Sequence, residues 1–262
     1  MSLIEGIPNE EYHLSSGFSR STAWNVITGS PARVNYDRNH PSKPTSALIL
    51  GNGFHSATLE PHLFEKEFEV KPGQIDGKSP LTKHYKEKFS EMQEEDESIT
   101  WLSRSEFEMV SDMADSANSH PWFRSMMDSG KFIVEGTGYL DCEGVKCKVR
   151  PDLYDPESGL IIDLKSTQDA SEQGFRSSVR KFGYSFQVFF YMEGLRRMGH
   201  HVSDFVFVAV EKTPPYLVGI YRINEEEIAR QERQMIRACQ IWANCTATKI
   251  YPGYSTEVVT LY

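Results

Sequence analysis

Two aspartates and a lysine in the middle of the chain are the residues best suited to chemistry. Asp152 closes the segment 148–152, and Asp163 and Lys165 lie in the segment 160–165. Side chains alternate between the faces of a strand, so Asp163 and Lys165 share one face. Two converging carboxylates favour Mg²⁺ or Mn²⁺, which polarise a phosphate and lower the pKa of a bound water. A lysine beside them can orient that water or stabilise negative charge. The pattern predicts metal-dependent cleavage of a phosphodiester.

These residues are predicted to lie on two neighbouring strands. The segments 144–154 and 159–166 are rich in Val, Ile and Leu and are separated by a Pro- and Gly-containing turn. A hairpin would place Asp152 and Asp163 side by side near its turn. The backbone carbonyl of Leu164 is then a further candidate metal ligand. The alternative is a surface hairpin with ordinary charges, because Asp-x-Lys is common by chance.

Four other residues are candidates for the same site. His55 lies in a predicted helix over 46–60 and can offer a neutral ring nitrogen to a metal. Glu135 lies in a predicted strand and can bind an ion directly or through water. Gln187 and Tyr191 are four residues apart in a helical stretch, so they share one face. Each has an ordinary alternative, in which the histidine or tyrosine packs in a core and the acid or glutamine faces solvent.

The order of these residues resembles the PD-(D/E)xK nuclease superfamily. Within it the chain is most similar to the RecB-like branch and, more narrowly, to RecE-type exonucleases. The matching stretches are 6–13, 50–61, 147–152 and 163–167. The resemblance extends from about residue 4 to about residue 220. The combination in this order is specific, whereas no single motif is.

The resemblance implies a role for each candidate. The implied ligands of Mg²⁺, or of Mn²⁺ in its place, are His55, Asp152, Asp163 and the backbone carbonyl of Leu164. Lys165 is implied to be the catalytic lysine, acting with the two aspartates, and Glu135 an auxiliary catalytic acid. The residues expected to contact DNA are Gln187, Tyr191, Arg150, Arg20, Arg180 and Lys181.

The implied activity is processive 5′-to-3′ degradation of one strand of linear double-stranded DNA. The 3′ tail would serve a RecT-like single-strand annealing protein in recombination, and relatives of this kind form ring-shaped tetramers. A bacterial cytoplasm, with a phage or prophage origin, is the implied setting. Two alternatives remain: a structure-specific endonuclease on the same fold, and a non-catalytic DNA-end-binding protein. Against the endonuclease, the sequence shows no obvious extra recognition domain. A non-catalytic DNA-end-binding protein would be expected to have lost one of the acids or the lysine, and all of these residues are present.

The net charge of −9 argues against a simple DNA-binding protein, which is usually basic. A metal-dependent enzyme needs only a local basic track, because the metal neutralises its carboxylates. Candidates for that track are Arg20, Arg33, Arg38, Lys43, Arg176, Arg180 and Lys181. The acidic runs at 91–97 and 224–227 would repel DNA, so we expect both to lie away from it.

Length and composition favour one globular domain over residues 1–262, with 39% hydrophobic residues. No apolar stretch approaches the ~18 residues of a membrane span, and the first residues lack a secretory signal pattern. A reducing cytoplasm is therefore expected. The four cysteines lack common zinc spacing, and none precedes Cys142. We therefore expect free thiols. Some of the RecB-like nucleases that this chain resembles bind an iron–sulfur cluster through one early and three late cysteines, so the resemblance implies no such cluster here.

The apolar patterns predict an α/β fold with a central mixed sheet flanked by helices. An N-terminal helical region precedes what the resemblance identifies as a PD-(D/E)xK nuclease core. Helices are predicted to start at Ser19, Ser30-Pro31, 46, Ser79-Pro80 and Ser103, with a strand at 67–70. The predicted core elements are strands at 131–140, 144–154 and 159–166, helices at 171–181 and 184–198, strands at 204–211 and 216–223, and a helix at 225–243.

Overall fold

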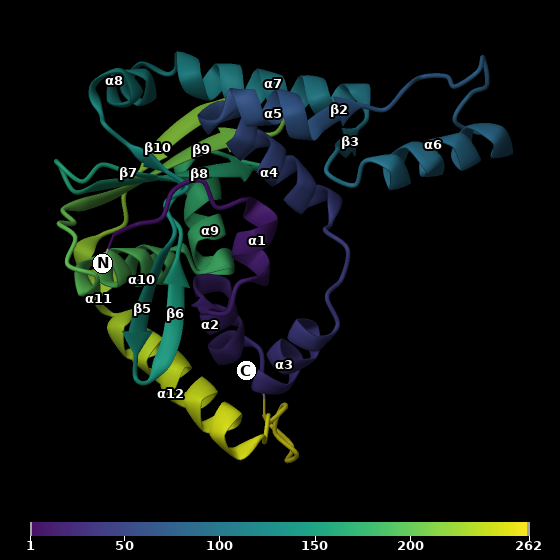
Figure 1. Ribbon diagram of the computed structural model, residues 1–262. Coiled ribbons are helices and arrows are strands. Elements are labelled where there is room, and N and C mark those ends of the chain that lie inside the picture. The colour runs from purple at the N-terminus through teal and green to yellow at the C-terminus, as the bar shows by residue number, and fades with distance from the viewer. Residues whose placement is uncertain (1, 261–262) are drawn as a thin grey trace.

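A five-stranded mixed sheet lies at the centre of the protein, seen here in a computed structural model that describes residues 2–260 (Figure 1). Its strands are β4 (Ile133–Val134), β7 (Leu153–Tyr154), β8 (Leu160–Thr167), β9 (Asp204–Glu211) and β10 (Val218–Tyr221). They are ordered β10-β9-β8-β7-β4. β8 and β9 are parallel, and the other neighbours are antiparallel. The predicted fold class is confirmed.

Two smaller sheets accompany the central one. The first is ordered β1-β6-β5, with β1 (Phe18–Ser19), β5 (Gly138–Cys142) and β6 (Val145–Val149). The second pairs β2 (Phe68–Val70) with β3 (Thr100–Leu102). The strand β6 runs from the first of these sheets directly toward β7 of the central sheet. It therefore carries the chain into the region of the candidate residues.

Helices cover both faces of the central sheet. Those before β4 are α1 (Asn9–Leu14), α2 (Arg20–Thr28), α3 (Pro31–Asn39), α4 (Ser46–Leu59), α5 (Pro61–Glu67), α6 (Lys83–Glu95), α7 (Arg104–Ser119) and α8 (Pro121–Ser129). Those after β8 are α9 (Glu172–Phe182), α10 (Tyr184–Arg197), α11 (Glu225–Ala229) and α12 (Glu232–Thr248). Figure 1 shows α4, α7 and α8 on one side of the sheet and α9 and α10 on the other.

Alternation along β8 divides its side chains between two cores. Ile162 and Leu164 pack with Phe54 of α4 in one buried cluster. Ile161 belongs to the opposite cluster, which contains Phe175 of α9 and Phe186 and Phe190 of α10. Because residues two apart share a face, Asp163 and Lys165 point to the side of α10. The predicted common face of these two residues is confirmed.

Two of the predicted strands are wrong in their extent, because each is interrupted in the structure. The two interruptions lie side by side. The segment 131–140 divides into β4 and β5, and the segment 144–154 divides into β6 and β7. β4 pairs with β7 in the central sheet, whereas β5 pairs with β6 in the smaller sheet. Pro151 lies at the second break and has no N–H for a ladder. At the crossing point the Glu135 N–H donates to the Asp152 carbonyl over 2.9 Å.

Other corrections concern boundaries. Ser79 and Pro80 precede the helix predicted there, because Thr82 caps α6 by accepting from the Tyr85 N–H. The predicted last helix is interrupted between α11 and α12, and the strand predicted at 216–223 is shortened to β10. The short elements α1, α5, α8, β1 and β3 were not predicted. The helix predicted over 46–60 and the capping box at Ser103 are confirmed.

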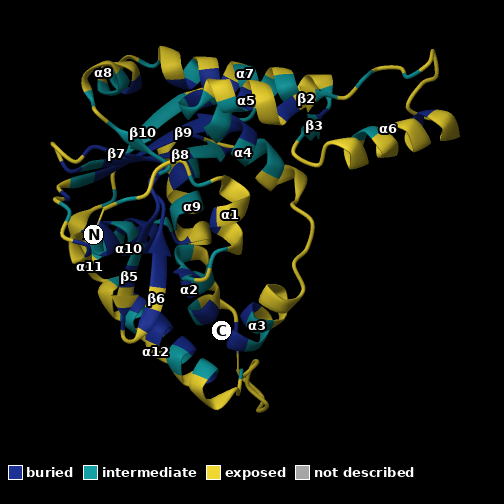
Figure 2. Cartoon of the chain, in the orientation of Figure 1, coloured by how far each residue is buried: buried dark blue, intermediate teal, exposed yellow. Residues whose placement is uncertain are grey.

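Burial follows this layering (Figure 2). The strands of the central sheet are largely buried, whereas α6 is exposed along most of its length and projects from the body. The acidic run 91–97 lies on the end of this projecting helix and the turn after it.

All four cysteines are buried free thiols. Within residues 2–260 no helix combines the length and apolarity that crossing a bilayer requires. The single domain over 1–262 stays a prediction.

Candidate active site

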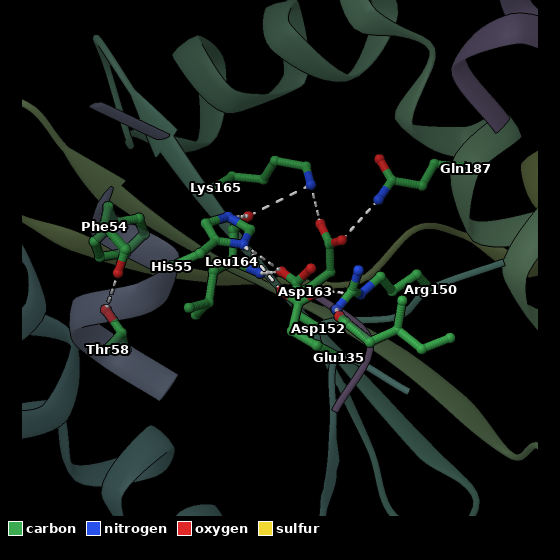
Figure 3. A network of polar contacts seen from close by, with 11 residues as sticks. Phe54, His55, Thr58, Glu135, Arg150, Asp152, Asp163, Leu164, Lys165 and Gln187 are labelled. Carbon is green, nitrogen blue, oxygen red and sulfur yellow. Dashed lines mark hydrogen bonds and ion pairs between the residues drawn. The ribbon is translucent and has the colours of Figure 1, made fainter. Parts of the chain in front are cut away.

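Three potential metal ligands converge where the chain crosses between the two larger sheets. His55 of α4, Glu135 after β4 and Asp152 before β7 each offer one ligand atom, and these atoms lie within 4.8 Å of one another. The His55 Nδ1 is 3.4 Å from an Asp152 carboxylate oxygen and 3.9 Å from a Glu135 oxygen. Figure 3 shows all three side chains pointing toward one another. One imidazole and two carboxylates form a donor set that fits a divalent cation.

Backbone contacts fix this group. The other ring nitrogen of His55, Nε2, is 3.0 Å from the Leu164 carbonyl oxygen. An Asp152 carboxylate oxygen accepts the Leu164 N–H over 2.6 Å. Phe54, fully buried beside His55, anchors this turn of α4 in the core. Of the predicted ligands, His55 and Asp152 belong to the converging group, the Leu164 backbone contacts both, and Asp163 lies outside the group; binding of a metal by these residues stays a prediction.

Glu135 has a more central position than the sequence suggested. It lies between β4 and β5, where the strand predicted over 131–140 is interrupted, and its φ of 50° is in the left-handed region. One carboxylate oxygen faces His55, and the other lies 2.8 Å from the Arg150 Nε. Glu135 thus belongs to the group of potential ligands itself.

Asp163 lies next to this group but has other partners. Its side chain is 2% exposed, forms an ion pair with Lys165, and accepts from the Gln187 Nε2 over 2.6 Å. Burial raises the pKa of Asp163 to about 6, even though the Lys165 ammonium opposes the rise. Gln187 is buried and donates to Asp163, and its role as a DNA contact stays a prediction.

The ammonium of Lys165 lies beside the carboxylates. Burial lowers its pKa, but the negative charges of Asp163 and Asp152 outweigh burial, and the net shift is upward. Its Nζ lies 5.2 Å from the centre of the Tyr184 ring. The aromatic face and the carboxylate together hold the charge in place. Tyr184 was missed from the sequence, where nothing separates it from the other aromatic residues of α10.

The predicted DNA-contact residues fall into two groups. Arg180 and Lys181 are exposed near the end of α9, and Arg20 donates to the carbonyls of Phe182 and Gly183 just beyond them. These three cations therefore lie close to one another at the start of α2 and the end of α9.

Tyr191 and Arg150 differ from this exposed group. Tyr191 is half-buried, and burial raises its pKa well above the ordinary value. The Arg150 side chain is only 7% exposed, and its role as a DNA contact stays a prediction. Its ion-pair partner is Glu135, and contacts with Ile7 and Tyr12 help to bury it.

The sequence of most of the chain matches one family model. Residues 21–260 match the PDDEXK-like domain of unknown function DUF3799. The chain belongs to this PDDEXK-like family. The predicted superfamily and the predicted nuclease class are confirmed by this assignment. No match was found among curated proteins.

Two solved structures are similar to this PDDEXK-like chain. A candidate exonuclease from Eubacterium rectale is 16% identical and superposes with a TM-score of 0.66, covering 98% of this chain and 96% of that one. A phage-related exonuclease from Haemophilus somnus 129PT is 15% identical, with a TM-score of 0.35, and covers 65% of this chain and 85% of that one. The first similarity supports the fold over nearly the whole length.

The protonation of His55 predicts how the stability of the metal-free protein depends on pH. Burial lowers the pKa of His55, but Asp152 and Glu135 outweigh burial and raise it to about 9, above the ordinary 6.5. The folded state therefore binds this proton more tightly, and its contribution to stability is complete below pH 6.5 and lost as pH rises to about 9. We expect the melting temperature in EDTA to fall over this interval, on the order of 5 °C.

Thermal unfolding of the wild type and of His55→Gln, each in EDTA across this pH range, measures the effect. The variant lacks the titrating ring, so its melting temperature should vary less with pH. Equal slopes for the two proteins would show that another group is responsible.

Proposed function

We propose that this protein is a metal-dependent exonuclease that degrades one strand of linear duplex DNA in the 5′-to-3′ direction. The observation that carries this proposal is the meeting of His55, Glu135 and Asp152 beside the Lys165–Asp163 pair. Membership of the PDDEXK-like family supports hydrolysis of a phosphodiester. The Eubacterium rectale neighbour, described as a candidate exonuclease, supports cleavage from an end.

The residues that would hold Mg²⁺, or Mn²⁺ in its place, are His55, Glu135 and Asp152, with Asp163 alongside. The Leu164 carbonyl faces the other ring nitrogen of His55, Nε2, so it would orient the imidazole. A bound divalent cation supplies charge neutralisation at the phosphate and a water of lowered pKa. The protein residues would hold the cation in position. His55 must give up a proton from Nδ1 to become a ligand, so binding should strengthen as pH rises toward 9.

Lys165 has the role of electrostatic stabiliser in this proposal. It carries an ammonium because Asp163 and Asp152 raise its pKa, so it donates hydrogen bonds and does not accept a proton. From its position it can donate to a phosphate oxygen or orient the attacking water. Asp163 holds the ammonium, and Gln187 in turn holds Asp163. In this proposal the ammonium would lie where negative charge develops during cleavage.

The cations Arg20, Arg180 and Lys181 would follow the DNA backbone, with Tyr191 nearer the site. Arg20 is held at the end of α9 by two backbone carbonyls, and Arg180 and Lys181 are exposed there. A track of this kind can bind phosphates although the net charge is −9. The further elements of the proposal are a RecT-like annealing partner, a ring-shaped tetramer, recombination from the 3′ tails, and a bacterial cytoplasm with a phage or prophage origin.

Degradation of end-labelled linear duplex tests the activity. With Mg²⁺ we expect 5′-terminal label to be released first while the complementary strand persists, and with EDTA we expect no release. A closed circle of the same sequence is the control and should stay intact, because it has no end. Cleavage of the circle would instead identify an endonuclease. Binding of ends without any cleavage would identify a DNA-end-binding protein.

A further inference from the structure

Arg150 is a buried cation to which the proposed chemistry gives no role. It follows the last residue of β6, and its side chain is 7% exposed. Its Nε lies 2.8 Å from the Glu135 carboxylate, and its Nη2 donates to the Ile7 carbonyl (Figure 3). A buried guanidinium is costly unless it is paired and hydrogen-bonded. Here the Glu135 carboxylate supplies the opposite charge and the Ile7 carbonyl accepts one hydrogen bond, whereas Nε and Nη1 have no hydrogen-bond partner among the described residues.

The segment 7–15 is held by two cations of this part of the chain. Residues 148 and 150 are two apart, and both face the Tyr12 ring, with the Lys148 Nζ 4.5 Å and the Arg150 Cζ 4.9 Å from its centre. The Lys148 Nζ also donates to the carbonyls of Tyr12 and Ser15, over 2.5 and 3.0 Å. Tyr12 is itself buried. The N-terminal segment is therefore part of the structure that surrounds Arg150.

Glu135 depends on this arrangement for its orientation. Its backbone has a left-handed conformation, which is unfavourable for a non-glycine residue. Its two carboxylate oxygens face different partners: Oε1 faces His55 at 3.9 Å, and Oε2 faces Arg150 at 2.8 Å. The contact with Arg150 thus leaves Oε1 directed at the group of potential ligands.

We propose that Arg150 is a positioning residue that holds Glu135 in the metal site and connects the segment 7–15 to metal binding. The Ile7 carbonyl and the Tyr12 ring fix the guanidinium, and the guanidinium fixes the carboxylate. Outer contacts of this kind orient ligands, and their loss typically weakens metal binding about 10- to 100-fold. This inference rests on the proposed metal site.

Long-range electrostatics alone predicts the opposite change in metal affinity when Arg150 is replaced. Arg150 is positively charged, so replacing it by a neutral residue removes repulsion from an incoming cation. If Arg150 contributed only its charge, Arg150→Gln would bind a divalent cation more tightly. If it positions Glu135, Arg150→Gln binds more weakly. The sign of the change therefore separates the two roles without any measurement of cleavage.

Titration of the metal-free full-length protein with Mn²⁺ alone, followed by calorimetry, is the direct test. We expect Arg150→Gln to weaken binding about 10-fold and Arg150→Lys to weaken it less, because lysine keeps the charge but cannot match both partners. Lys146→Gln is the matched control, since it removes a nearby cation in β6, the strand that precedes Arg150. The Lys146 ammonium lies over the Tyr139 ring and not over Tyr12. This variant should bind Mn²⁺ like the wild type.

A double-mutant cycle identifies the residue through which Arg150 acts. Glu135→Gln should weaken Mn²⁺ binding, and adding Arg150→Gln to it should cause no further loss. Tyr12→Leu should weaken binding about 2- to 3-fold when Arg150 is present and not when it is replaced. Thermal unfolding of each variant checks the fold, and Arg150→Lys replaces Arg150→Gln if the latter does not fold.

The outcomes separate the two proposals. If Glu135→Gln and Asp152→Asn both bind Mn²⁺ like the wild type, the metal site itself is wrong. If both lose affinity while Arg150→Gln and Arg150→Lys keep it or gain it, only the role of Arg150 is overturned. Additive losses in the double variant would also overturn that role, because Arg150 would then act independently of Glu135.

Discussion

Lys165→Ala should lower the rate of Mg²⁺-dependent degradation of linear duplex DNA at least about 100-fold while leaving Mn²⁺ affinity unchanged or higher. The Lys165 side chain is 16% exposed, and its ammonium is paired with Asp163 beside the proposed ligands. It donates hydrogen bonds and cannot coordinate a cation. Its removal therefore deletes stabilisation of developing negative charge, and it also deletes repulsion of the metal. A loss of activity accompanied by equal or tighter metal binding is the expected signature.

Single-turnover rates and Mn²⁺ titrations on the same preparations measure both quantities. Lys181→Ala is the control, because this exposed lysine should affect DNA binding and leave the single-turnover rate at saturating DNA nearly unchanged. A Lys165→Ala enzyme that cleaves at the wild-type rate would remove this residue from the mechanism. Loss of metal binding in the same variant would mean that Lys165 maintains the geometry of the ligands.

The parts of the site that depend on local rules could be predicted from the sequence. The alternation of β8 placed Asp163 and Lys165 on one face, because a period of two follows from strand geometry alone. The helix that carries His55 was predicted from its apolar spacing and from Pro61 after it. The capping box at Ser103 is likewise a contact between residues three apart.

The rest depends on pairings between distant segments. Glu135 and Arg150 lie in apolar stretches that read as continuous strands, and both stretches break because each contributes to two sheets. That division is a property of the whole strand order and has no local signal apart from Pro151. The burial of Arg150 also requires the segment 7–15, more than 130 residues earlier in the chain. From the sequence alone, Arg150 was therefore predicted to be a surface residue that contacts DNA.

Asp152→Asn should abolish both activity and metal binding with little change in fold. We expect degradation to fall at least about 1000-fold, since a lost ligand removes several kcal/mol of charge stabilisation. The amide oxygen can still accept the Leu164 N–H, which Asp152 accepts over 2.6 Å, so the strand should remain in place. Among the contributions that raise the pKa of His55, Asp152 is the largest, although burial opposes it. The variant should therefore also lose most of the pH dependence of its metal-free stability.

Melting temperatures with EDTA and with Mn²⁺ test this variant independently of catalysis. The wild type should be stabilised by the metal, and Asp152→Asn should not, because a ligand that binds only the folded state raises its stability. Asp155→Asn is the matched control: this aspartate lies in the same hairpin, but its oxygens accept from the Glu157 N–H and the Ser158 hydroxyl. It should keep the response to the metal even if its turn is weakened. A normal response in Asp152→Asn would place the cation elsewhere, and the assignment of the three converging ligands would have to be abandoned.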